Sequence, residues 1–144
     1  LHIGIIRSEW NTEITGNLLN GAIATLKKYG IKENNIIQHD VPGSFELPLG
    51  AKFLLSSAKL DAIICLGCVI QGETPHFDFI CSAVASGITT VGLEFNTPVI
   101  FGVLTTNTLQ QAKDRSGGKF GNKGVEAAAT AVLMAMLKFN LKKK

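Results

Sequence analysis

Residues 61–70 read Asp-Ala-Ile-Ile-Cys-Leu-Gly-Cys-Val-Ile, and every position after the aspartate is apolar or glycine. A strand with one face in water alternates apolar and polar residues, whereas a strand covered on both faces is apolar throughout. Strands of the second kind are typical of parallel sheets that carry helices on each side. This segment therefore predicts the centre of a parallel sheet.

On either side of this segment, strand-like and helix-like patterns alternate. The further strands are expected at 2–7, 35–41 and 98–104, and the helices at 11–29, 45–57, 77–93, 106–116 and 122–139. Such alternation predicts an α/β fold, a three-layer α/β/α sandwich with a flavodoxin-like, four-stranded parallel sheet and helices on both faces. No linker or repeat divides the 144 residues, so residues 1–144 are expected to form a single domain.

Composition narrows the class of protein. Charged residues make up 17% of the chain and apolar residues 46%, against about 25% charged in average proteins. This excludes a disordered chain and predicts apolar surface that faces other subunits. The net charge of +3 equals the charge of Lys142, Lys143 and Lys144. The remainder is therefore near neutral, and no nucleic-acid partner is expected.

The apolar runs and the cysteines point to a cytoplasmic location. Apolar runs are interrupted within about seven residues, short of the roughly 20 that cross a bilayer, so no transmembrane helix and no membrane partner are expected. No signal peptide is recognisable, and three cysteines are an odd number, which favours a reducing compartment. Cys65 and Cys68 are spaced like a redox or zinc pair, but a strand points them to opposite faces and no second pair of ligands is present. We interpret them as small buried residues and expect no metal site.

In parallel sheets, ligands bind at the carboxyl ends of the strands. Trp10 follows the first strand, where its ring could stack on a planar heterocycle or cover the core. Ser44, Phe45 and Glu46 follow the second strand at the start of a helix. There Ser44 offers an N-cap, and Glu46 could contact a ligand or cap the helix.

The loop after the third strand reads Gly72-Glu73-Thr74-Pro75-His76. Backbone amides around Glu73 and Thr74 are expected to cradle an anion such as phosphate. His76 stands at the mouth of this cradle, and histidine is suited to transfer protons near neutral pH. Arg115, farther along the chain, could bind phosphate with its planar guanidinium or form a surface ion pair. These residues predict a small phosphorylated substrate and acid–base chemistry.

Five motifs, in this order, resemble the 6,7-dimethyl-8-ribityllumazine synthase family of riboflavin biosynthesis. They are Val-Pro-Gly-Ser-Phe-Glu-Leu-Pro at 41–48, Gly-Glu-Thr-Pro-His-Phe-Asp at 72–78, Phe-Gly-Val-Leu-Thr-Thr at 101–106, Gly-Asn-Lys-Gly at 121–124 and Glu-Ala-Ala at 126–128. The resemblance implies a transferase that condenses 5-amino-6-(D-ribitylamino)uracil with 3,4-dihydroxy-2-butanone 4-phosphate. Imine formation, phosphate elimination and ring closure would release phosphate and water, with no cofactor.

The resemblance also implies a role for each site residue. His76 would shuttle protons, Trp10 and Phe45 would flank the pyrimidine, and Ser44 and Glu46 would contact the pyrimidine and its ribityl chain. The edge of the pyrimidine would be contacted by backbone groups of Cys68, Val69 and Ile70. The phosphate would be contacted by Glu73, Thr74 and Arg115. The pocket would be completed from an adjacent subunit by Phe101 and Lys123. Two positions depart from the family pattern, with Gln71 where arginine is frequent and Trp10 where phenylalanine is usual.

The family's assembly supplies further expectations. The resemblance implies a ring of five subunits, extended to a hollow sixty-subunit shell, and an association with riboflavin synthase.

Two alternative functions stay open. A flavodoxin-like flavin carrier is suggested by Thr15-Gly16-Asn17, which is similar to a phosphate loop after the first strand. A non-catalytic shell protein that binds lumazine or riboflavin would keep the pocket without the proton shuttle.

Overall fold

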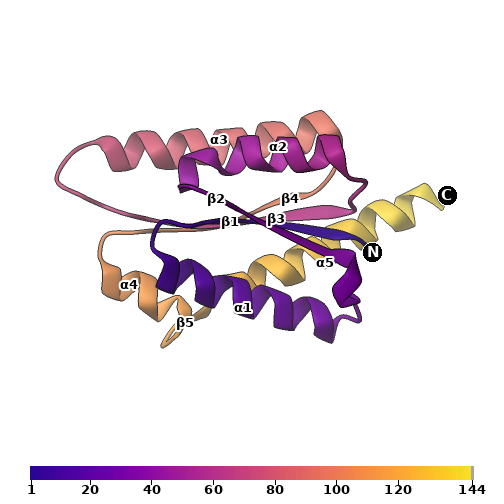
Figure 1. Ribbon diagram of the computed structural model, residues 1–144, viewed down its shortest axis with the longest axis horizontal. Helices are drawn as coiled ribbons and strands as arrows, with labels where there is room; N and C mark the ends of the chain where they lie inside the picture. Colours follow the sequence, from indigo (N-terminus) through magenta and orange to yellow (C-terminus); the bar gives the residue numbers. More distant parts are fainter. Residues whose placement is uncertain (144) are drawn as a thin grey trace.

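The computed structural model describes residues 1–143. Its central feature is a parallel sheet with the strand order β2-β1-β3-β4, enclosed between two layers of helices (Figure 1). The strands are β1 (Ile3–Ser8), β2 (Ile36–Val41), β3 (Ala62–Ile70) and β4 (Val99–Thr106). This arrangement confirms the predicted three-layer, flavodoxin-like α/β/α fold.

The helices divide between the two faces of the sheet (Figure 1). One face is covered by α2 (Leu47–Ser57) and α3 (His76–Phe95). The other is covered by α1 (Thr12–Lys28), α5 (Lys123–Lys142) and the short α4 (Leu109–Asp114). Two single 3₁₀ turns, Glu33–Asn35 and Ser44–Glu46, precede β2 and α2.

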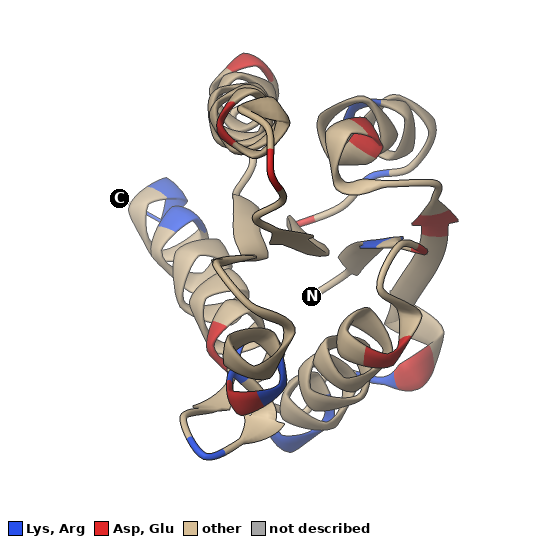
Figure 2. Cartoon of the chain, turned by 90° about the vertical axis from the view of Figure 1, so that its left-hand side faces the viewer, with Lys and Arg blue, Asp and Glu red and all other residues tan. Residues whose placement is uncertain are grey.

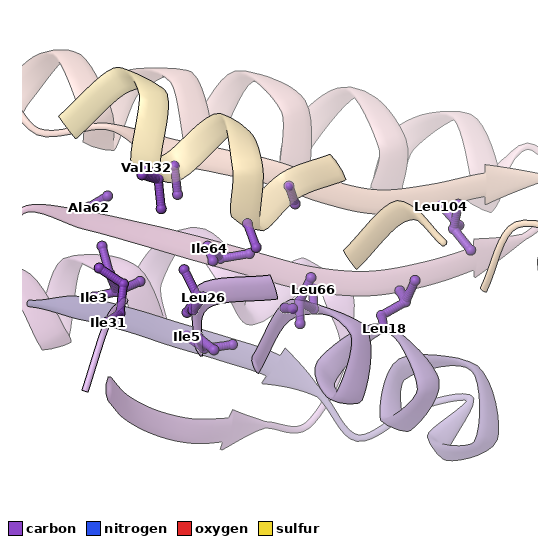
Figure 3. Close-up of a cluster of buried hydrophobic side chains, with 14 of the residues drawn as sticks. Ile3, Ile5, Leu18, Leu26, Ile31, Ala62, Ile64, Leu66, Leu104 and Val132 are labelled. Atoms are coloured by element: carbon purple, nitrogen blue, oxygen red, sulfur yellow. The ribbon is translucent and has the colours of Figure 1, made fainter. Parts of the chain in front are cut away.

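The prediction that β3 is covered on both faces is confirmed. All residues from Ala62 to Cys68 are buried, and successive side chains enter opposite cores. Ile64 and Leu66 join the core beneath α1 and α5, where side chains from β1, β3 and both helices meet (Figure 3). Ile63 and Cys65 join the core beneath α2 and α3.

The cysteines behave as small buried residues of the sheet. Cys65 and Cys68 enter opposite cores, and all three cysteines are free thiols. Burial raises the pKa of Cys65 to about 12 and the pKa of Cys68 to about 11. Both thiols are therefore protonated, and unreactive as nucleophiles, at neutral pH.

The structure corrects the expected elements near the C-terminus. The helix expected at 106–116 is shorter, because β4 continues to Thr106 and the Thr108 side chain caps a helix that begins at Leu109. The glycine-rich segment after it forms an antiparallel hairpin, with β5 at Ser116–Gly118 and β6 at Gly121–Asn122. The last helix also runs beyond 139, to Lys142.

Two helices, α3 and α5, are long and apolar enough to cross a membrane by length and composition alone. The expectation based on uninterrupted apolar runs overlooked them. Core helices pass the same test, and both helices pack one side on the sheet, through Val84 and Ile88 of α3 and through Ala128 and Ala131 of α5. Lysines lie at the C-terminal end of α5, whereas the charged residues of α3 are the acidic Asp78 and Glu94 (Figure 2).

Helices α1 and α5 approach so closely that glycine is required where they meet. A Cβ atom on Gly124 would overlap the backbone carbonyl of Leu18. Beside it, the Asn122 side chain accepts a hydrogen bond from the Gly124 N–H (2.8 Å) and donates one to the carbonyl of Asn17 (3.1 Å). Through this close contact and these hydrogen bonds, the Gly-Asn-Lys-Gly motif packs the start of α5 against α1. The same contacts fix the position of Lys123.

This contact predicts opposite effects for two glycine-to-alanine substitutions. Gly124→Ala forces the helix backbones apart, and we expect a loss of stability of about 1–3 kcal/mol. Gly16→Ala, within α1, meets no atom within 4 Å and is expected to gain about 1 kcal/mol from helix propensity. Thermal unfolding at matched protein concentrations measures both changes. Equal shifts for the two variants would contradict the close packing.

Candidate active site

The topology of the sheet directs ligands to the carboxyl ends of β1 and β3. These strands are neighbours, yet the helix after β1 lies on one face of the sheet and the helix after β3 lies on the other. The two chain segments diverge at this point and leave a crevice between them, which is where doubly wound sheets bind ligands.

A pocket of about 410 Å³ occupies this position. It brings together many of the residues selected from the sequence, and these come from the ends of β1 and β3, the turn before α2, and the start of α3. Its lining residues are Trp10, Asn11, Gly43, Ser44, Phe45, Glu46, Cys68, Val69, Ile70, His76 and Ile80.

The turn after β2 presents a hydroxyl without a partner. Ser44 is only 6% exposed, and its Oγ makes no hydrogen bond within residues 1–143. It rests against Gly67 of β3, where an added Cβ atom would lie 2.6 Å from the oxygen. The expected capping role of Ser44 is therefore wrong. A buried hydroxyl without a partner costs about 1–3 kcal/mol, and among the hydroxyls of this kind found in residues 1–143, those of Ser8, Thr15 and Ser44, only that of Ser44 lies at this pocket.

Glu46 performs the capping role in this turn. Its Oε2 accepts a hydrogen bond from the backbone N–H of Gly43 at 3.0 Å. The carboxylate thereby fixes the turn that carries Ser44 and Phe45. Glu46 is itself exposed at the pocket, so the capping bond and a ligand contact are compatible.

Two aromatic rings stand at the edge of the pocket. Trp10 is 72% exposed and Phe45 is 55% exposed, so the alternative that Trp10 covers the core is wrong. The loop that carries Trp10 is tied to the end of β2, because the N–H groups of Glu9 and Trp10 donate to the carbonyls of Val41 (2.9 Å) and Pro42 (3.1 Å). Exposed rings on a fixed backbone are suited to stack on a flat ligand.

A bidentate ion pair reinforces the β1–β2 edge just before this loop. The Arg7 guanidinium donates to both carboxylate oxygens of Asp40, at 3.0 and 2.7 Å. These hydrogen bonds hold the pKa of Asp40 below its ordinary value. The pair joins residues in direct register across the two strands.

Only part of the segment that spans the loop before α3 and the first residue of α3 lines the pocket. His76 is the first residue of α3, and its side chain is exposed and lines the pocket. Within residues 1–143 it makes no side-chain hydrogen bond or ion pair. Glu73 and Thr74 are exposed in the preceding loop and line neither this pocket nor the second one described below.

Phe101, Arg115 and Lys123 lie elsewhere, in a second pocket of about 570 Å³. It is formed by the end of β4, helix α4, the β5–β6 hairpin and the start of α5. The two pockets share no lining residue. The residues predicted for one site therefore form two separate groups within a single chain.

Arg115 lies in this second pocket without a carboxylate partner. One guanidinium nitrogen donates to the carbonyl of Gln111 (3.1 Å), and the guanidinium carbon lies 4.8 Å from the centre of the Phe120 ring. No carboxylate in residues 1–143 forms an ion pair with it. The alternative of a surface ion pair is wrong, and the positive charge remains available to an anion.

The β5–β6 hairpin holds the second pocket together, and the sequence patterns did not predict it. The Lys123 N–H donates to the Arg115 carbonyl (2.9 Å), and the Phe120 N–H donates to the Asp114 carbonyl (2.7 Å). Gly117 and Gly121 have φ angles of 106° and 86°, which strongly favour glycine. The hairpin therefore fixes Arg115, Phe120 and Lys123 as one unit.

Asn11 is a pocket residue that was not selected from the sequence. Its backbone is left-handed (φ 61°), and its Nδ2 donates to the carbonyl of Cys68 at 3.1 Å. The bond connects the end of β1 to the part of β3 that extends beyond β1. Asparagine tolerates the left-handed region better than most residues, which is the signal that could have identified this position.

The comparisons with known proteins agree on one family. The family model for 6,7-dimethyl-8-ribityllumazine synthase matches residues 1–138. A protein of that name from Cytophaga hutchinsonii is 63% identical over 131 residues, covering 91% of this chain and 82% of its own length. Proteins of the same name from Phocaeicola vulgatus and Bacteroides fragilis are each 52% identical over 143 residues. These two alignments cover 99% of this chain, with 85% of the first relative and 100% of the second.

The two functions of Asn11 can be separated by substitution. Asn11→Gly removes the bond to Cys68 but keeps the left-handed backbone free of strain, whereas Asn11→Ala loses both. We expect Asn11→Ala to unfold at a lower temperature than Asn11→Gly, by the equivalent of about 1 kcal/mol. We also expect Asn11→Gly to be less stable than the parent by about 1 kcal/mol. If Asn11→Ala were as stable as Asn11→Gly, the left-handed backbone at this position would not strain alanine, and the prediction would be wrong.

Proposed function

We propose, since the chain belongs to the 6,7-dimethyl-8-ribityllumazine synthase family, that it performs the reaction for which the family is named. In this reaction, 5-amino-6-(D-ribitylamino)uracil and 3,4-dihydroxy-2-butanone 4-phosphate condense to 6,7-dimethyl-8-ribityllumazine, with release of phosphate and water. The main support from the structure is the β1–β3 pocket, where an unpaired buried hydroxyl, two exposed rings and a free histidine meet.

The pyrimidine substrate fits the first pocket. Its flat ring would lie against Trp10 and Phe45, with a hydrogen bond to the unpaired Ser44 hydroxyl and Glu46 near the ribityl chain. β1 pairs with β3 only as far as Leu66, while β3 continues to Ile70. The backbone groups of Cys68, Val69 and Ile70 beyond that point would meet the edge of the pyrimidine.

His76 would move the protons of the condensation. As the substrate amine adds to the ketone carbon, the nitrogen loses a proton, which the imidazole can accept. The imidazole passes this proton to the ketone oxygen, which becomes the carbinol hydroxyl. A second proton from the nitrogen is then carried to this hydroxyl in the same way, so that water leaves and the neutral imine forms. Positioning the two substrates supplies the rest of the rate enhancement, and the reaction requires no protein nucleophile.

The phosphorylated substrate would be held between two subunits. Phe101, Lys123 and the unpaired Arg115 of one subunit would meet the first pocket of its neighbour, and Arg115 would bind the phosphate. The separation of the two pockets within one chain supports this arrangement. Glu73 and Thr74, exposed in the loop before α3, would contact the same phosphate, near Gln71.

A ring of five subunits would bring the two groups together. Support comes from large apolar side chains that the single chain leaves exposed on α3 and α5: Phe79, Leu93, Leu133, Leu137 and Leu141. Side chains of this kind favour burial against other copies. We extend the proposal to a sixty-subunit shell in the cytoplasm that associates with riboflavin synthase, as the family resemblance implies.

The structure weakens the flavin-carrier alternative. Thr15, Gly16 and Asn17 lie inside α1, and Thr15 is fully buried, so they do not form a phosphate loop. Incubating the purified protein with both substrates decides between the functions. We expect a colourless protein that produces a fluorescent lumazine. A yellow protein with stoichiometric flavin and no turnover would establish the carrier, and a pocket that binds lumazine without forming it would establish the shell protein.

His76→Ala is expected to lower kcat by about 100-fold or more, because general acid–base catalysis contributes about 100- to 10,000-fold. Both KM values should change little, since the rings and backbone groups that bind the substrates remain. Steady-state assays with each substrate varied in turn measure these constants. An unchanged kcat would remove His76 from the proposed mechanism.

The shared site can be tested by mixing subunits. His76→Ala and Arg115→Ala subunits are each expected to be nearly inactive alone. In co-expressed, randomly mixed rings, roughly a quarter of the interfaces pair an intact His76 with an intact Arg115, and activity should recover to about that fraction. Co-assembled rings without recovery would place both residues in the site of one subunit.

A further inference from the structure

Phe120 is a large apolar side chain held in the open. It lies with Lys119 in the two-residue turn between Gly118 and Gly121, and it is 58% exposed. Its backbone is nevertheless fixed, because its N–H donates to the carbonyl of Asp114 at 2.7 Å. A ring that is exposed on a fixed turn contributes little to the core. Its fixed position allows it to interact with a neighbouring side chain.

Arg115 is the group that lies beside the ring. The guanidinium is 4.8 Å from the ring centre, and its other contact is a hydrogen bond to the carbonyl of Gln111 at 3.1 Å. Both contacts orient a cation, and neither contributes a negative charge. Glu126 lines the same pocket, but it forms no ion pair with Arg115 within residues 1–143.

The nature of these contacts determines what Arg115 can do. A carboxylate partner would hold the guanidinium equally well, but it would compete with an incoming anion for the same N–H groups. The face of an aromatic ring attracts a cation through its quadrupole and occupies no N–H group. A ring therefore orients the arginine while leaving its charge and donors free.

We propose that Phe120 is a positioning residue that holds Arg115 ready for the phosphate of the butanone substrate. The inference rests on the proposed function in one respect, namely that Arg115 binds this phosphate. Lys119 also lies over the ring, with its Nζ at 5.2 Å. Lys119 does not line the pocket, however, whereas Arg115 does.

Kinetic constants for the two substrates test the proposal. Phe120→Leu should raise the KM for 3,4-dihydroxy-2-butanone 4-phosphate about two- to fivefold, the effect of one exposed cation–π contact. The KM for the pyrimidine and the kcat should change less than twofold. Phe120→Tyr keeps a ring and should restore the parental KM. The inhibition constant of inorganic phosphate should rise by the same factor as this KM, because phosphate would bind more weakly.

Two comparisons show whether the effect passes through Arg115. In an Arg115→Gln background, Phe120→Leu should change the KM for the phosphorylated substrate no further, because there is no guanidinium left to orient. Lys119→Gln, which removes the other cation on the ring, should leave this KM within twofold. Additive effects of Phe120→Leu and Arg115→Gln, or an equal effect of Lys119→Gln, would overturn the proposal.

The remaining outcomes separate this inference from the proposed function. If Arg115→Lys raises the KM for the phosphorylated substrate and Phe120→Leu does not, Arg115 binds the phosphate without help from the ring, and the inference fails alone. If Arg115→Lys changes neither KM, the phosphate role of Arg115 fails, and the inference fails with it. If Phe120→Leu raises both KM values equally and lowers the unfolding temperature, the ring stabilises the hairpin and the inference is wrong.

Discussion

The rest of the structure depends on the requirement that β3 be covered on both faces. A strand in which every residue from Ala62 to Cys68 is apolar or glycine, and buried, cannot leave either face in water, so helices must pack on each side. The connection from β1 to β2 and the connection from β3 to β4 run in opposite directions across the sheet, so right-handed crossovers direct the helices after β1 and β3 to opposite layers. The crevice at the ends of these strands is a direct result, and the first pocket occupies it.

The same patterns show what the sequence could predict. The strands β1, β3 and β4 follow from apolar runs, and the end of α1 follows from Gly30, whose φ of 85° stops the helix. Locating the pocket required only the strand ends and the rule for parallel sheets. These features are local, or they follow from local features by topology.

The unpredicted parts depend on contacts between distant residues. The β5–β6 hairpin has strands of three and two residues, too short to show alternation, and the bonds from Phe120 and Lys123 to Asp114 and Arg115 hold it in place. The bond from Asn11 to Cys68 crosses from one strand to another. The partner of Arg115 was also beyond sequence reasoning, because only the folded hairpin brings an aromatic ring, rather than a carboxylate, against it.

Several positions that oppose the stability of the single chain lie at the two pockets. Ser44 buries a hydroxyl without a partner, Asn11 adopts a left-handed backbone, and Trp10 and Phe120 leave large rings in water. Each is unfavourable in an isolated chain, and the buried hydroxyl and the exposed rings become favourable when a ligand or a neighbouring subunit supplies the missing contact. A core cavity or a misplaced polar group would be equally unfavourable, but it would gain nothing from a partner. The presence of such features at two separate surfaces of one chain therefore supports the proposal of a site that becomes complete only when two chains meet.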